Sequence, residues 1–106
     1  MVAADVRFTI QNVIARHVNF DEAFVFLFGS RASGHEKKAS DYDIGIYTGH
    51  PLPLSKIAKI KDEIEDCPIP VDVDIVDFSK ASDEFRKIAL EKIQVWNRPK
   101  TNLKLI

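Results

Sequence analysis

Hydrophobic residues recur every three to four positions in three segments of the chain, which predicts three amphipathic helices. The first helix is expected over residues 4–17. The second is expected over residues 55–67, with Ser55 as its N-cap and Pro68 as its stop. The third is expected over residues 82–95, with an apolar side formed by Phe85, Ile88, Ala89 and Ile93. Helices of this kind bury their apolar side against other elements.

Three shorter segments have the composition or the alternation of β-strands. Residues 23–28 are all apolar and end at Gly29, which predicts a buried strand. Residues 41–47 and 71–77 alternate between polar and apolar positions, so each predicted strand has one more polar face and one apolar face. The polar stretch over residues 29–40 is expected to be a loop with one helical turn. The predicted order is αβαβαβα, an α/β (α+β) fold with a small mixed sheet.

Composition narrows the class of protein further. The 106 residues include 15 Lys and Arg against 16 Asp and Glu, a net charge of −1, with 45% hydrophobic residues. These values are typical of one soluble domain, here residues 1–106 with a C-terminal tail over 97–106. The apolar runs are far shorter than the roughly 20 residues of a membrane helix. A single cysteine, Cys67, and a start without signal-peptide features fit the cytoplasm. Near-zero charge argues against general nucleic-acid binding.

Carboxylates are placed where two of the predicted strands could bring them together. Asp41 and Asp43 lie two positions apart on one strand and therefore project from the same face. The last predicted strand carries Asp74 among apolar residues, with Asp72 on the same face. If the two strands are neighbours, three carboxylates cluster and raise one another's pKa unless a cation neutralises them. Oxygen ligands suit Mg²⁺, which also binds substrate phosphates.

Gly29 and Ser30 stand where a buried strand ends and a polar loop begins. Glycine lets the backbone turn sharply and approach a ligand, and Ser30 with the following N–H groups can hold phosphate oxygens. Arg31 would add positive charge at this point. A Gly-Ser turn or an Asp-x-Asp pair alone is usually an ordinary surface feature. Together the features form an ordered set: a strand, Gly-Ser, ten residues, Asp-x-Asp on a second strand, and an acid in an apolar third strand. This set is expected by chance on the order of once in several hundred such sequences.

These residues resemble the signature of the polymerase-β-like nucleotidyltransferases. Gly29-Ser30 is followed after ten residues by Asp41-x-Asp43, which is the spacing of that superfamily. Residues 29–34 and 40–44 are similar to its small one-domain branch, the minimal nucleotidyltransferases, or MNT antitoxins. Residues 73–78 resemble the strand with the third acid in that branch. The resemblance assigns this place to Asp74 rather than to Asp72 or Asp77.

The resemblance implies a Mg²⁺-dependent transfer of a nucleoside monophosphate, here AMP from ATP, to a hydroxyl group. Asp41, Asp43 and Asp74 would be the catalytic residues and would hold two Mg²⁺ ions. Asp74 would lie nearest the acceptor and help to deprotonate its hydroxyl. The nucleotide-binding residues that it implies are Gly29, Ser30, Arg31 and Ser40.

The resemblance also implies a partner. Larger relatives have a second domain for the acceptor, whereas this chain stops after one helix beyond its third strand. In the MNT branch the partner is a HEPN-family RNase toxin, which the antitoxin adenylylates on a tyrosine. Two alternatives stay open: a module that neutralises its partner by binding alone, and a transferase for a small molecule such as an aminoglycoside. The missing second domain disfavours the latter.

Two segments are expected to dock the partner. One is the loop over residues 29–40, and the other is the C-terminal segment over residues 95–106, where apolar residues continue beyond Pro99. A hetero-oligomer with the HEPN protein and a weaker homodimer of the chain alone are therefore expected. Asp77 should point away from Asp74, and Trp96 is expected to cover the core.

Overall fold

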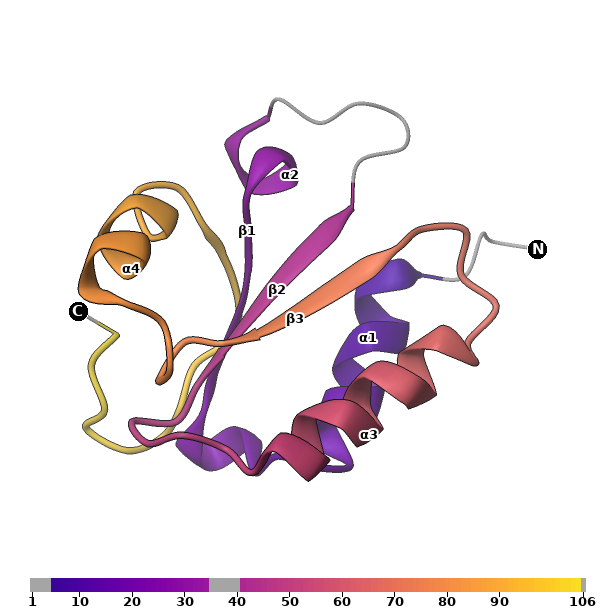
Figure 1. Ribbon diagram of the computed structural model, residues 1–106, viewed down its shortest axis with the longest axis horizontal. Helices are drawn as coiled ribbons and strands as arrows, with labels where there is room; N and C mark the ends of the chain where they lie inside the picture. Colours follow the sequence, from indigo (N-terminus) through magenta and orange to yellow (C-terminus); the bar gives the residue numbers. More distant parts are fainter. Residues whose placement is uncertain (1–4, 35–40, 106) are drawn as a thin grey trace.

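A four-stranded sheet with helices on both of its faces forms the framework of the computed structural model, which describes residues 5–34 and 41–105 (Figure 1). The strand order is β3-β2-β1-β4. Their bounds are β1 Phe24–Phe28, β2 Tyr42–Tyr47, β3 Val73–Asp77 and β4 Gln94–Asn97. Strand β1 pairs antiparallel with β2 and β4, whereas β2 and β3 are parallel. The predicted mixed sheet is confirmed.

The first two predicted helices begin and end near the predicted positions. Helix α1 (Val6–Ala15) is capped by the Asp5 carboxylate, which accepts from the Phe8 N–H at 3.1 Å. Helix α3 (Leu54–Glu65) ends before Pro68, as expected. It starts directly after Pro53, so the prediction of Ser55 as its N-cap is wrong. The fixed φ of proline suits an entry into a helix without a side-chain cap.

The third predicted helix is too long. Helix α4 covers only Asp83–Ala89, capped by Ser82, and residues 94–97 form strand β4 instead. The reason is tertiary, because β1 would otherwise present an unpaired edge, and Trp96 gains burial by joining the sheet. The observed order therefore has one strand more than the predicted αβαβαβα. Short helical pieces complete the chain: η1 (Phe20–Glu22) and α2 (Ser30–Ser33).

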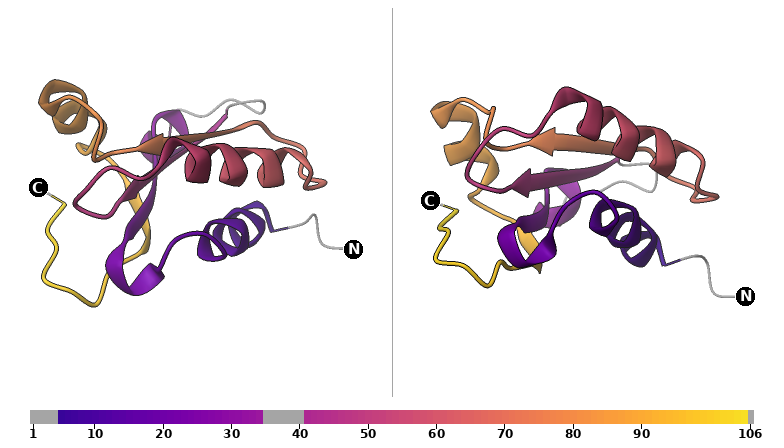
Figure 2. Two further views of the ribbon diagram at one scale, coloured as in Figure 1. Left: turned by 60° about the horizontal axis from the view of Figure 1, so that its bottom comes forward. Right: turned by 90° about the horizontal axis from the view of Figure 1, so that it is seen from below.

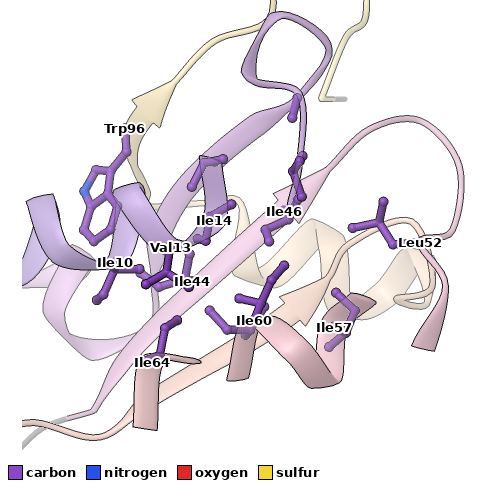
Figure 3. Packing of buried hydrophobic residues seen from close by; sticks show 14 of the residues in the cluster. Ile10, Val13, Ile14, Ile44, Ile46, Leu52, Ile57, Ile60, Ile64 and Trp96 are labelled. Carbon is purple, nitrogen blue, oxygen red and sulfur yellow. The ribbon is translucent and has the colours of Figure 1, made fainter. Parts of the chain in front are cut away.

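Each face of the sheet has its own hydrophobic core. On one face α1 and α3 lie side by side, and their isoleucines contact those of β2, with Trp96 at one end (Figures 2 and 3). The other face is aromatic. Its buried members are Phe24, Phe26, Phe28, Phe78 and Leu105, packed against the end of α4. The alternation of β2 thus separates Ile44 and Ile46 from Asp43, which lies on the aromatic face.

The C-terminal segment belongs to this second core. Leu105 is 9% exposed, Leu103 packs beside it, and the Lys100 N–H donates to the Asp21 carbonyl at 2.8 Å. Trp96 and Leu105 are buried and Val95 and Leu103 are partly buried, so little apolar surface of this segment is exposed; the docking surface expected here stays a prediction. Ile106 lies outside the described residues. Within those residues, no helix is both long enough and apolar enough to cross a bilayer.

Candidate active site

The turn between β1 and α2 brings the backbone against a carboxylate. Gly29 has φ +75°, a left-handed conformation that favours glycine. A Cβ atom at this position would collide with the Asp43 carboxylate. Backbone conformation and space both require glycine here. Ser30 follows as the first residue of α2, and its side chain is exposed.

Two of the predicted carboxylates face each other across parallel strands. Asp43 of β2 is paired in register with Asp74 of β3, and Asp41 immediately precedes β2. Asp43 is partly buried, while Asp41 and Asp74 are exposed. Burial, then the negative charge of Asp74 and then that of Asp41, raise the pKa of Asp43. The fold therefore places Asp41 and Asp74 near Asp43, which itself lies against the Gly29 turn.

Two other acids, Asp72 just before β3 and Asp77 at its end, have different surroundings. Asp72 is exposed, and its charge is not among those that raise the pKa of Asp43. This arrangement places Asp74, rather than Asp72, beside Asp43. Asp77 points to the opposite face, as expected, and is buried. Its carboxylate accepts from the N–H groups of Leu52 at 2.8 Å and Ser79 at 3.0 Å. Asp77 is therefore a structural acid.

The donor set of the cluster fits a hard divalent cation. Asp41, Asp43 and Asp74 offer only carboxylate oxygens, the ligands that Mg²⁺ prefers, and their mutual repulsion would be relieved by positive charge. Within residues 5–34 and 41–105, no three acidic, histidine or cysteine side chains already converge as a metal site. The side chains would have to turn toward a bound ion.

Arg31, another predicted nucleotide-binding residue, contacts an aromatic ring of β2. The guanidinium of Arg31 lies 4.3 Å from the centre of the Tyr42 ring. Tyr42 packs against the isoleucine core on the face opposite Asp43, and its ring is 6.4 Å from that of Trp96. The structure therefore directs Arg31 away from the three carboxylates. Ser40 lies outside the described residues.

An apolar cavity beside the Gly29 turn was not anticipated from the sequence. It has a volume of about 370 Å³, and its apolar lining includes Phe28, Phe85, Ile88 and Ala89. Phe85 is 43% exposed and Ile88 70% exposed. The helical periodicity of the sequence predicted only that these side chains belong to the apolar side of a helix. Only the three-dimensional structure shows that they line a cavity together with Gly29.

The comparison with known families decides the affiliation. The model of the family described as "Polymerase beta, Nucleotidyltransferase" matches residues 9–101, which includes Gly29, Ser30 and the three carboxylates. The chain belongs to this family. Its mixed sheet is the fold of the family, and the resemblance of the sequence motifs is confirmed.

Individual relatives agree with this membership. The "probable protein adenylyltransferase MntA" of Haemophilus influenzae is 35% identical over 71 residues, which are 67% of this chain and 61% of that protein. The match thus spans less than two thirds of the relative's length.

Two solved complexes have the same fold. A toxin–antitoxin structure with AMP-PNP has a TM-score of 0.70 at 20% identity, over 87% of this chain and 73% of the other. A complex of a tri-AMPylated Shewanella oneidensis HEPN toxin with its MNT antitoxin has a TM-score of 0.65 at 18% identity, over 88% and 71%. At these identities the similarity concerns the fold.

Proposed function

We propose that this chain is an antitoxin that transfers AMP from ATP to a tyrosine hydroxyl of a HEPN-family toxin. The observation that carries this proposal is the pairing of Asp43 with Asp74 directly against the Gly29–Ser30 turn. Family membership supports the reaction class. The name of the Haemophilus influenzae relative and the toxin complexes that share the fold support the acceptor.

In this proposal the three carboxylates hold Mg²⁺, which would bind the triphosphate and stabilise charge on the attacking and leaving oxygens. Asp41 and Asp43 orient the nucleotide from β2. Asp74, on the neighbouring strand, accepts the proton of the acceptor hydroxyl. The oxygen of that hydroxyl then forms a bond to the α-phosphorus, and the bond to the bridging oxygen breaks, releasing pyrophosphate.

The Gly29–Ser30 turn supplies the other half of the site. Because Gly29 has no side chain, the backbone can approach the phosphates while remaining next to Asp43. Ser30 contributes its hydroxyl and the first N–H groups of α2 to the β- and γ-phosphates. The protein thus supplies mainly position and electrostatics, as phosphoryl transfer requires.

The test is a transfer experiment with ATP labelled in the α-phosphate, Mg²⁺ and the protein encoded beside this chain. Label should appear on that protein and should disappear with Asp41→Ala or Asp43→Ala. Glu22→Ala, which alters an exposed carboxylate of η1 away from the site, is the matched control and should transfer normally. Equal labelling by all variants would contradict the proposal.

A non-catalytic antitoxin would give a different result. If Asp43→Ala suppressed the toxicity of the partner as fully as the unaltered chain, at equal expression, binding alone would account for neutralisation. We expect Asp43→Ala to lose neutralisation together with the transfer of label.

A further inference from the structure

The proposed reaction gives no role to the apolar cavity beside the Gly29 turn. Its volume, about 370 Å³, lies in the range of roughly 300–1,000 Å³ that is usual for small-molecule pockets. The apolar lining comes from the end of β1 and from α4, and Ser33, Glu91 and Lys92 form a polar part. The cavity therefore has both the size and the mixed lining of a ligand pocket.

Two phenylalanines give the cavity aromatic walls. The rings of Phe28 and Phe85 are 6.1 Å apart and nearly perpendicular, with an interplanar angle of 89°. Phe28 is buried, whereas Phe85 is 43% exposed. Ile88, about one turn further along α4, is 70% exposed. Large apolar side chains that remain this exposed beside a cavity are typical of a ligand-binding surface.

The cavity lies on the same face of the sheet as the carboxylates. Phe28 is paired in register with Asp43, and Asp43 with Asp74, so the three residues form a row across β1, β2 and β3. Directly paired residues of neighbouring strands point to the same face. Gly29 lines the cavity, and a Cβ atom added to it would collide with the Asp43 carboxylate. The cavity thus adjoins the turn that contacts Asp43.

The proposed reaction determines which substrate reaches the cavity. The acceptor hydroxyl approaches Asp74 on β3, and the phosphates of ATP lie at the Gly29–Ser30 turn. Because β2 separates β3 from β1, the cavity beside β1 is on the side away from the acceptor. The substrate that extends into it is therefore the nucleotide.

We infer that this cavity binds the adenine base of ATP, which stacks against the partly exposed ring of Phe85 and borders Ile88. Every base has a flat aromatic face, and stacking on an aromatic side chain holds such a face. The edge of the base reaches the polar part of the lining. The inference rests on the proposed function only for the place of the phosphates.

The first test separates the base from the phosphates. Binding of ATP and of inorganic tripolyphosphate is measured by calorimetry, both with Mg²⁺. We expect the unaltered chain to bind ATP at least about tenfold more tightly than tripolyphosphate, because only ATP has a base to stack. Equal affinity for the two ligands would overturn the inference.

Variants of Phe85 locate the contact. Phe85→Ala should weaken binding of ATP about tenfold and leave that of tripolyphosphate unchanged, whereas Phe85→Tyr keeps the ring and should bind ATP like the unaltered chain. Phe8→Ala is the matched control, because Phe8 is 63% exposed on α1, which packs on the other face of the sheet. It should change ATP affinity less than about twofold. Equal ATP affinity of Phe85→Ala and Phe8→Ala would overturn the inference.

A spectroscopic test needs no variant. In the unaltered chain saturated with ATP and Mg²⁺, nuclear Overhauser contacts should join the base protons of ATP to the ring protons of Phe85 and the methyl protons of Ile88. Saturation without these contacts would overturn the inference. The cavity would then be left for an apolar side chain of the partner protein.

The outcome for the cavity is separable from that for the transfer reaction. Binding of ATP against Phe85, but no transfer of label to the partner, would uphold the cavity and contradict the proposed function. Transfer of label together with unchanged ATP affinity in Phe85→Ala would contradict the cavity alone.

Discussion

The surroundings of Asp43 disfavour the ionised form of its side chain. It is partly buried, it faces Asp74, and it lies near Asp41, and these features together raise its pKa. A carboxyl with a raised pKa in the folded chain binds protons more strongly there than in the unfolded chain. Its ionisation therefore lowers stability as pH rises from about 3.9 through the folded-state pKa. A positively charged ligand beside Asp43 would remove this penalty.

Replacing Asp43 with asparagine should remove this opposition. We expect Asp43→Asn to match the unaltered chain near pH 4 and to exceed its stability by up to about 1 kcal/mol near pH 7, since solvent screens part of the repulsion. Urea denaturation at the two pH values measures the difference, with Glu22→Gln as a control for an exposed acid. A variant less stable than the unaltered chain at neutral pH would show that Asp43 is a structural acid like Asp77.

Gly29 and Gly34 form a matched pair, because both have a positive φ, +75° and +79°. Alanine at Gly34 would have nothing within 4 Å, whereas alanine at Gly29 would collide with Asp43. We expect Gly34→Ala to lower stability by about 1 kcal/mol, and Gly29→Ala to lower it by about 2–3 kcal/mol and to abolish ATP binding. Thermal unfolding and ATP titration measure both effects. Similar behaviour of the two variants would show that the contact with Asp43 is unimportant.

At the scale of elements, the C-terminal segment closes the aromatic core after β4. Leu105 is buried among phenylalanines of β1, whereas its neighbour Lys104 is exposed. We expect Leu105→Ala to lower the free energy of unfolding by about 2–3 kcal/mol, and Lys104→Ala to change it by less than about 0.5 kcal/mol. Urea denaturation measures both. Equal, small effects would show that Leu105 does not stabilise the aromatic core.

An exposed ion pair joins α3 to the residues that follow α1. Glu63 accepts from Arg16 at 2.9 Å and lies 2.7 Å from His17, and these hydrogen bonds lower the pKa of Glu63. A lowered pKa contributes stability above about pH 4.3, the unfolded value, and that contribution is lost as pH falls through the folded-state pKa.

Glu63→Gln should therefore lower the melting temperature slightly at neutral pH, with no difference at strongly acidic pH. The effect should shrink at high salt because the groups are exposed. Glu65→Gln, an exposed acid of the same helix, is the control and should melt like the unaltered chain. A loss in Glu63→Gln that persisted at acidic pH would exclude an ionic origin.

For the whole molecule, patterns that depend on local alternation were predictable from the sequence. The pairing of Asp43 with Asp74 follows from the alternation of two strands once these are neighbours. Features that depend on distant partners were not predictable. Residues 94–97 form a strand because β1 offers an edge, and Arg31 lies over Tyr42 because α2 sits at that end of β2. Helical periodicity could not show that Phe85 and Ile88 border a cavity at the site.

Calorimetric titration with ATP in the presence of Mg²⁺ tests the central claim, that the three carboxylates and the Gly29–Ser30 turn form a nucleotide site. We expect one saturable site in the unaltered chain and affinity at least about 30-fold lower, or roughly 2 kcal/mol weaker, in Asp43→Asn. Glu22→Gln should bind like the unaltered chain. Equal binding of ATP by folded Asp43→Asn would show that these carboxylates do not form the nucleotide site.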